Sequence, residues 1–288
     1  MLGLWNNLTY PEMIAKNAAE SLDFDFFKLH QELLDDLEMN QSSIEMIEFF
    51  HISLQQVVIK AGNAKLWAIV SEMIGKLHQD VFVMTDTKGQ RTILHYAIEW
   101  GNCDVVQLLV NLMPPEAFAK QDNDLETVLH RATGKGHFEM VQILLKKMPL
   151  EALAKQDACQ STAFHIAAER GHLDIIQMLI QHMPHQETLM KQDDLDRTAL
   201  HWASEYGHQD IVEMLLKQMP PGSSEFLVKR DVNQRTALHW AAQCGHVKIV
   251  QMLVKQMAPD DIVQQDRQGH TALTLAQKYG HCNTFLLD

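Results

Sequence analysis

Cysteine is scarce in this sequence, and the few copies are widely separated. The 288 residues contain four cysteines, Cys103, Cys159, Cys244 and Cys282, and no two of them form a C-x-x-C pair. A zinc knuckle or a disulfide framework needs closely and regularly spaced cysteines, so this spacing argues against both. We therefore expect free thiols.

Long apolar runs are also missing. Stretches such as Met178 to Ile180 end at glutamine or charged residues, far short of the ~20 apolar residues that cross a bilayer. Residues Met1 to Pro11 lack the basic segment, apolar stretch and small-residue cleavage site of a secretory signal. The sequence predicts no membrane insertion and a cytoplasmic location.

Basic residues are too few and too scattered for nucleic-acid binding. The chain has 24 Lys and Arg against 37 Asp and Glu, a formal net charge of -13. No Lys/Arg cluster stands out that could neutralise a phosphate backbone. Residues 1–85 hold 12 acidic and 5 basic residues, and this uneven distribution of charge indicates a distinct N-terminal module.

What the sequence does contain is an internal repeat. A threonine followed three residues later by histidine occurs at Thr92/His95, Thr127/His130, Thr162/His165, Thr198/His201 and Thr236/His239. A further copy begins at Thr271, with Thr274 in place of histidine. Successive threonines lie 35, 35, 36, 38 and 35 residues apart. This period is typical of stacked helix-turn-helix units.

Each copy has the composition of two short helices. The threonine is a candidate N-cap of the first helix, an alanine five residues later allows close helix approach, and a glycine ends the helix. The second helix, for example Phe138 to Lys147, places Val141, Leu144 and Leu145 on one apolar stripe. That stripe predicts a shared core between successive units.

The repeated pattern is Asp, Thr-x-Leu-His-x-Ala, Gly-His and Ile-Val-x-x-Leu-Leu, and Asp193 to Leu216 and Asp231 to Leu253 show it best. It resembles the ankyrin repeat over residues 86–288. The resemblance implies an all-α fold: an ankyrin-repeat α-solenoid of stacked helix-turn-helix units with an N-terminal helical cap. It also implies a protein–protein interaction module that binds its partner on a concave surface.

Two domains follow from this pattern. Residues 51–288 form the ankyrin-repeat domain, with a degenerate repeat at 51–85 and repeats starting near 87, 122, 157, 193, 231 and 266. Residues 1–50 are expected to form a helical cap or a small helical module, because the ends of a repeat array must be covered. Met-Pro pairs such as Met148-Pro149 follow the second helices. After them we expect an extra helical turn instead of the family's extended finger.

The 16 histidines do not indicate metal binding or catalysis. Five occupy the Thr-x-x-His position and five more follow the helix-ending glycine. The resemblance implies that the first set forms hydrogen bonds to the backbone of neighbouring repeats. No histidine has ligand-like spacing to acids or thiols, no copy combines a nucleophile with a base, and each glycine stands alone. We expect no metal, no cofactor and no enzymatic activity.

Positions that vary between copies are the candidates for partner binding. By resemblance they are the turn tips and the exposed ends of the first helices. The candidates are Lys88, Arg91, Glu99, Trp100, Asp124, Glu126, Lys135, Glu169, Arg170, Arg197, Trp202, Glu205, Tyr206, Asn233, Arg235, Trp240, Gln243, Lys278 and Tyr279. Trp and Tyr dominate interface hot spots. Trp202 and Trp240 have an alternative role in packing between repeats.

The expected molecule is a monomeric, non-enzymatic adaptor, scaffold or inhibitor that binds another protein. Two alternatives concern residues 1–50. The segment from Pro11 to Phe27 is similar to the opening of an F-box, which would make the chain a ubiquitin-ligase adaptor, and a bacterial effector acting in the host cytosol or nucleus is compatible with this. A catalytic N-terminal module is the other alternative.

Overall fold

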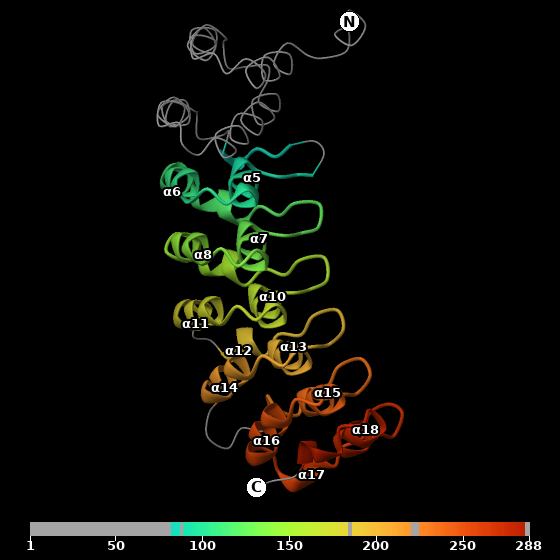
Figure 1. Ribbon diagram of the computed structural model, residues 1–288. Helices are drawn as coiled ribbons and strands as arrows, with labels where there is room; N and C mark the ends of the chain where they lie inside the picture. The colour runs from blue at the N-terminus through green and yellow to red at the C-terminus, as the bar shows by residue number, and fades with distance from the viewer. Residues whose placement is uncertain (1–81, 87–88, 184–185, 220–224, 286–288) are drawn as a thin grey trace, which may run out of the picture. The chain divides into compact units, whose positions relative to one another are not determined.

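The computed structural model describes residues 82–86, 89–183, 186–219 and 225–285 (Figure 1). In these ranges the regular elements are α-helices and 3₁₀ helices, with one isolated β-bridge between Gln265 and Thr271. The N-terminal region 1–50 and almost all of the degenerate repeat 51–85 lie outside the described residues. The predicted domain boundaries therefore stay predictions.

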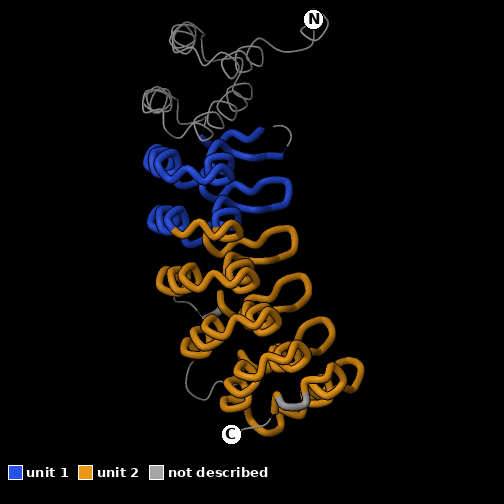
Figure 2. The backbone as a smooth tube through the Cα atoms, in the orientation of Figure 1, with its two compact units in different colours: residues 1–132, 139–152 blue, residues 133–138, 153–288 orange. Residues whose placement is uncertain are grey.

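The chain divides into two compact units, which are described separately (Figure 2). The first unit runs to Ala132 and includes Glu139–Ala152. Its helices are α5 (Ile93–Trp100), α6 (Cys103–Leu112), the 3₁₀ helix η2 (Pro115–Ala119) and most of α7 (Val128–Gly134), α8 (Phe138–Leu145) and α9 (Leu150–Leu153). Here α5 packs on α6, and each such pair is one repeat.

The second unit comprises Thr133–Phe138 and Leu153–Asp288. Its helices are α10 (Ala163–Arg170), α11 (Leu173–His182), α12 (Gln186–Leu189), α13 (Ala199–Tyr206), α14 (Gln209–Lys217), α15 (Ala237–Cys244), α16 (Val247–Gln256), α17 (Pro259–Ile262), α18 (Ala272–Lys278) and the 3₁₀ helix η3 (Cys282–Phe285). The first helices of the repeats, α10, α13, α15 and α18, lie next to one another, and α11, α14 and α16 form the row behind them (Figure 1).

Each first helix begins at the repeated threonine. At α13 the Thr198 backbone N–H donates to Nδ1 of His201 at 3.1 Å, and the Thr198 hydroxyl lies 2.9 Å from the same nitrogen. Because Nδ1 accepts from the amide, the proton is on Nε2, which donates to the Arg235 carbonyl of the next repeat at 3.1 Å. One imidazole thus caps its own helix and binds the neighbouring repeat, which confirms the predicted backbone hydrogen bond.

The first helices α5, α10, α13 and α15 end at a glycine because the chain must turn through the left-handed region. Gly171 has φ 76° and its backbone caps α10. The histidine of the next repeat fills the space that a side chain would need: a Cβ at Gly171 would lie 2.5 Å from Cε1 of His208. His208 Nε2 donates to the Glu169 carbonyl at 3.0 Å. Glycine is therefore required here by conformation and by close packing.

The core lies between the two rows of helices. In the second unit Leu200 and Ala203 of α13 and Val212 and Leu215 of α14 are fully buried. Short helical turns follow the second helices, as the Met-Pro pairs predict, and α9 is one of them. The expectation that these turns replace the extended fingers is wrong, because the fingers are present as well. Each finger is held by its own aspartate, which the short helix does not displace.

Candidate functional site

Each repeat projects a finger, defined here as the turn from the repeated aspartate to the residue before the capping threonine. In finger 193–197, Asp193 Oδ1 accepts the backbone N–H of Leu195 at 2.9 Å and of Arg197 at 2.8 Å. Asp266 forms the same pair of bonds with Gln268 and His270. Burial raises the pKa of Asp266, but these bonds and the Arg235 guanidinium outweigh burial and lower it. The carboxylate therefore stays ionised and fixes the turn.

Backbone hydrogen bonds join the fingers of the second unit. Asp194 N–H donates to the Cys159 carbonyl at 2.9 Å, and Val232 N–H donates to the Leu195 carbonyl at 3.0 Å. Arg267 N–H continues the ladder to the Asn233 carbonyl at 2.8 Å. Because these groups are main-chain atoms, they hold the fingers together whatever side chains stand at the tips.

A stack of cations and aromatic rings lies behind these fingers. The Arg197 guanidinium lies 4.6 Å from the centroid of the Trp202 ring and 4.1 Å from that of Trp240. Arg235 lies 5.0 Å from the Trp240 centroid, on the next repeat. Tyr206 extends the stack, with its ring centroid 6.1 Å from that of Trp202. The stack joins α13 and α15 and is favourable as a series of cation–π contacts.

Carboxylates fix both indoles and neutralise the buried guanidinium. The Trp202 indole N–H donates to Asp193 at 2.8 Å and that of Trp240 donates to Asp231 at 3.0 Å. Arg197 pairs with Glu205 at 2.7 Å. Since every polar end has a partner, the aromatic rings are held in one orientation.

The first unit has a smaller version of this arrangement. The Arg91 guanidinium lies 6.0 Å from the Tyr96 centroid, and Tyr96 stacks on Trp100 at 5.7 Å. Arg131, at the position of the tryptophans, forms ion pairs with Asp122 and with Glu99 at 3.2 Å. Arg131 is not among the binding residues predicted from the sequence. Its place four residues after Thr127, where other copies have Trp, is the signal that could have found it.

The predicted site residues fall into three groups by exposure. Tyr206 (51%) and Tyr279 (50%) are exposed, as are Asp124, Lys135, Arg170, Asn233 and Lys278. The half-buried residues are Arg91, Glu99, Trp100, Glu126, Glu169, Trp202, Glu205, Arg235 and Gln243. Lys88 lies outside the described residues.

Two of the predicted partner-binding residues are buried. Trp240 is 7% exposed and Arg197 is 9% exposed. Both are enclosed by the stack and by their carboxylate partners, so their large side-chain surfaces face the protein itself. Their burial favours a supporting role beneath the exposed aromatics, which for Trp240 is the packing role given as its alternative.

The described residues present no arrangement typical of a catalytic or metal site. No group of three or more His, Cys, Asp and Glu among them is placed to hold a metal ion. Burial lowers the pKa of His201 to about 4, with the Asp231 carboxylate opposing this shift. A neutral imidazole whose two nitrogens are both bonded has a structural role.

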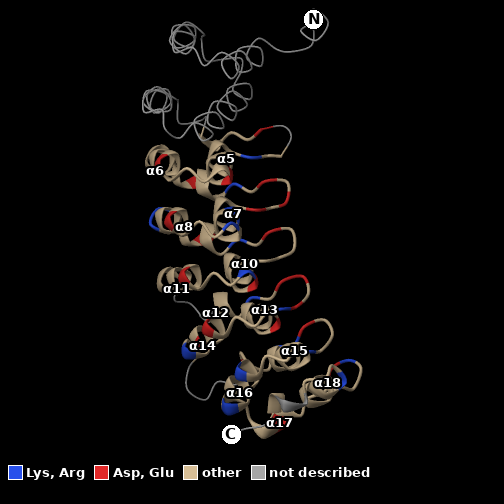
Figure 3. Ribbon diagram, in the orientation of Figure 1, with Lys and Arg blue, Asp and Glu red and all other residues tan. Residues whose placement is uncertain are grey.

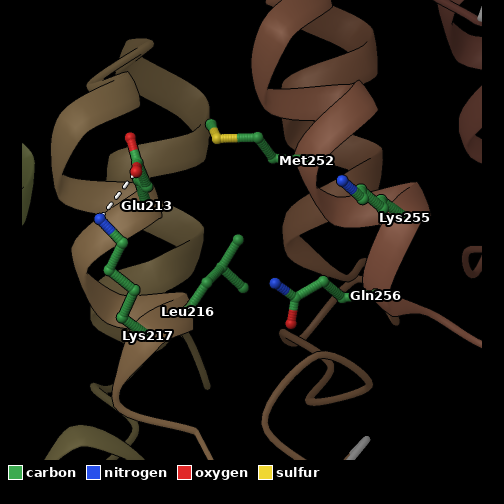
Figure 4. Close-up of a pocket in the computed structure, with 6 residues that line it drawn as sticks. All are labelled: Glu213, Leu216, Lys217, Met252, Lys255 and Gln256. Atoms are coloured by element: carbon green, nitrogen blue, oxygen red, sulfur yellow. Dashed lines mark ion pairs between the residues drawn. The ribbon is translucent and has the colours of Figure 1, made fainter.

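A groove of about 540 Å³ lies on the other row of helices, between α14 and α16 (Figure 4). Its lining is Glu213, Leu216, Lys217, Met252, Lys255 and Gln256. Lys217 pairs with Glu213 at 2.8 Å, four residues apart on one exposed helix face. This groove has a small apolar floor and an ion pair of little energetic weight, so the fingers and first helices are the better candidate site.

Comparisons with known proteins agree with this geometry. The model of the family described as ankyrin repeats (3 copies) matches residues 54–154, 149–225 and 222–288. The chain therefore belongs to the ankyrin-repeat family, and the predicted all-α ankyrin-repeat fold is confirmed. Ankyrin repeats are protein-interaction modules, and no catalytic family is indicated.

Among solved structures, the chain is similar to the crystal structure of the ankyrin repeat domain of Bcl-3, described as a unique member of the IkappaB protein family. The TM-score is 0.63 at 21% identity, covering 81% of this chain and 96% of that chain. This likeness supports the fold alone. No curated protein matches the sequence. None of the described helices combines the length and apolar character needed to cross a membrane.

Proposed function

We propose that this chain is a non-enzymatic adaptor, scaffold or inhibitor that binds a protein partner on its finger-side surface. In each unit we define this surface as the fingers together with the exposed ends of the first helices, which in the second unit include Tyr206 and Tyr279. The observation that carries the proposal is that these two tyrosines occupy one repeat position and are half exposed (51% and 50%).

The physical basis of binding is preorganisation. The fingers are joined by backbone bonds and Tyr206 is stacked on Trp202. A partner therefore orders few side chains when it docks, and less free energy is lost on association. Exposed aromatic residues supported from behind are typical of interface hot spots.

The row of second helices is a weaker candidate for partner binding. Lys217 and Glu213, which line the groove between α14 and α16, are 69% and 49% exposed and pair with each other. Solvated charges of this kind contribute little to affinity. We therefore place the partner on the finger-side surface.

The test is capture of binding proteins on the immobilised full chain, quantified by mass spectrometry. Trp100→Ala, Tyr206→Ala and Tyr279→Ala together remove the aromatic position from both units. We expect at least a tenfold loss of the captured partner, since each hot-spot aromatic contributes about 1–2 kcal/mol or more.

The matched control is Gln142→Ala, Gln177→Ala and Lys248→Ala, three exposed positions on the second helices α8, α11 and α16. Both variants must show the helical circular dichroism of the parent chain. Full partner capture by a folded aromatic variant would remove the finger-side surface as the binding site.

A further inference from the structure

The fingers of the second unit differ from one another in the chemistry of their tips, defined here as the three residues after the repeated aspartate. The tip is Ala-Cys-Gln in finger 157–161 and Asp-Leu-Asp in finger 193–197. It is Val-Asn-Gln in finger 231–235 and Arg-Gln-Gly in finger 266–270. All of these tip residues are exposed. In chain order, the last three tips are therefore acidic, neutral and basic.

The backbone ladder keeps this order in space. Val232 N–H donates to the Leu195 carbonyl at 3.0 Å, and Arg267 N–H donates to the Asn233 carbonyl at 2.8 Å. Each tip is thus bonded to the next, and the neutral tip lies between the acidic and the basic one. Figure 3 shows acidic residues on the finger that precedes α13 and a basic residue on the finger that precedes α18.

Two exposed aliphatic side chains meet where the acidic and neutral tips join. Leu195 is 40% exposed and Val232 is 39% exposed. The turn itself does not require them, because the equivalent positions in the last finger are Gln268 and Arg267. Covering such aliphatic surface is favourable by about 25 cal/mol per Å². The joined tips therefore offer an apolar contact to a bound partner.

The acidic side chains on either side of Leu195 are not neutralised. Asp194 and Asp196 form no ion pair with a described residue. The cation of the same finger, Arg197, is already engaged, because it pairs with Glu205 at 2.7 Å and lies 4.1 Å from the centroid of a tryptophan ring. Two charges of one sign attract the opposite charge and raise its rate of encounter.

The basic tip at the other end has a charge of its own to offer. Arg267 is exposed, and its side chain forms no ion pair with a described residue. The preceding Asp266 does not neutralise it, because that carboxylate accepts the turn amides of Gln268 and His270 and pairs with Arg235 at 3.1 Å. The three tips thus have unpaired charge of opposite sign at their two ends.

We infer that these three tips dock a segment of the partner protein whose side chains are basic, apolar and acidic in that order across the fingers. The basic side chain pairs with Asp194 and Asp196. The apolar side chain covers Leu195 and Val232, and the acidic one pairs with Arg267. This inference deepens the proposed function and rests on it, because it specifies the chemistry of the partner at one part of the finger-side surface.

The same features argue against other occupants. A uniformly acidic or uniformly basic segment would meet like charge at one end. A second copy of this chain, turned around, would also bring Arg267 to Asp194. The three tips have only nine residues between them, however, against about 20–30 residues a side in a stable interface. A segment of a partner that is also held by the first helices needs no larger area here.

The test uses the capped peptide Lys-Lys-Gly-Leu-Gly-Glu-Glu at low salt, with NMR of the Val232 and Arg267 amides in the full chain. Two further peptides replace either both lysines or both glutamates with glutamine, and a third replaces leucine with serine. We expect the parent peptide to bind about twofold to fivefold more tightly than either glutamine peptide, the range for an exposed ion pair. The serine peptide should also bind more weakly.

Variants of the chain assign each end of the peptide to its tip. Asp194→Asn with Asp196→Asn should abolish the preference for lysine over glutamine and leave the preference for glutamate intact. Arg267→Gln should have the reverse effect. The matched control is Asp174→Asn with Asp210→Asn, which removes the same charge from exposed positions on α11 and α14 and should leave both preferences unchanged.

Several results would overturn the inference. They are equal binding of the parent and glutamine peptides, no shift of the tip amides at millimolar parent peptide, and loss of the lysine preference in the control. A dimer in sedimentation that Arg267→Gln dissociates would assign the tips to a second copy instead. If any of these occurs while the triple alanine variant loses its partner, the proposed function stands and only the tip inference fails. Retained capture in that variant contradicts the proposed function itself.

Discussion

One residue in each finger adopts a left-handed backbone, and in most copies it has a side chain. Gln160, Asp196 and Gln234 have φ values of 56°, 58° and 61°, whereas the last repeat has Gly269 at 81°. The left-handed region costs an L-residue about 1–2 kcal/mol, and glycine avoids this cost. These fingers therefore hold strain that the aspartate bonds of the turn must offset.

Replacing such a residue with glycine should stabilise the protein. For Gln160→Gly we expect a gain of about 0.5–1 kcal/mol, because relief of the left-handed strain exceeds the extra entropy that glycine gives the unfolded chain. The measurement is the midpoint of urea unfolding, which should rise.

The reverse substitution is the control. Gly269→Gln introduces a Cβ with no atom within 4 Å, so only backbone strain is added and the midpoint should fall. An unchanged midpoint in both variants would show that the finger conformation has no energetic cost.

At the scale of the element, the junction between a first helix and the next repeat depends on glycine for two separate reasons. Gly171 and Gly280 have φ values of 76° and 84°. A Cβ at Gly171 would lie 2.5 Å from the His208 ring, but a Cβ at Gly280 would meet nothing within 4 Å. A comparison of these two glycines therefore separates the effect of backbone strain from the effect of packing.

We expect Gly171→Ala to destabilise the chain by about 2–4 kcal/mol, since it adds the loss of the His208 hydrogen bond to the left-handed strain. Gly280→Ala should cost about 1–2 kcal/mol, from strain alone. Thermal or urea unfolding of the two variants side by side measures the difference. Equal losses would mean that the histidine contact contributes nothing.

The leucine two residues after the capping threonine shows how repeats cover one another. Leu238 is 1% exposed and Leu273, its equivalent in the last repeat, is 42% exposed. Leu238→Ala should cost about 2–5 kcal/mol because it leaves a cavity between α15 and its neighbours. Leu273→Ala should cost less than about 1 kcal/mol, because exposed substitutions have little effect. A large loss from Leu273→Ala in urea unfolding would show that this face is covered in solution.

How far the sequence determines these features depends on how local they are. The capping of α13 by Thr198 and His201 needs only residues three apart, so the repeated pattern predicts it. The enclosure of Trp240 depends on Arg197 and Arg235, which come from two different repeats. Position alone therefore placed Trp240 among the binding residues, while Tyr206, at a helix end, is exposed as predicted.

The fingers are a second feature that local sequence pattern does not fully predict. Helix-forming residues after Met148-Pro149 predict a short helix, and α9 is there. Their helix propensity gives no information on the aspartate that organises the following turn, as Asp193 does with two backbone bonds. The finger therefore persists beside the extra helix.

At the scale of the whole molecule, the capping histidines make stability depend on pH. Burial lowers the pKa of His95 and His201 to about 4, against the ordinary value of 6.5. Between these values the unfolded chain binds more protons than the folded chain, so stability rises with pH. The contribution is complete above pH 6.5 and is lost as the pH falls toward 4.

We expect the free energy of unfolding to fall by about 1–2 kcal/mol for each of these two histidines between pH 7 and pH 5. Urea unfolding at pH 7, 6 and 5 measures this loss, and NMR of the imidazole protons should show no titration of His95 or His201 above pH 5. The lowered pKa values of Asp122 and Asp266 act below this window, since aspartate is ionised in both states at pH 5. A constant stability from pH 7 to pH 5 would contradict neutral, buried imidazoles.

The backbone ladder that joins the fingers has an evolutionary consequence. Asp194, Val232 and Arg267 each connect to the preceding finger through an amide and a carbonyl, groups that almost every amino acid supplies. Mutation can therefore exchange the side chains at the tips one by one without altering the scaffold beneath them. A lineage carrying this protein could acquire a new target by point substitution alone, and the tips are where related chains should diverge first.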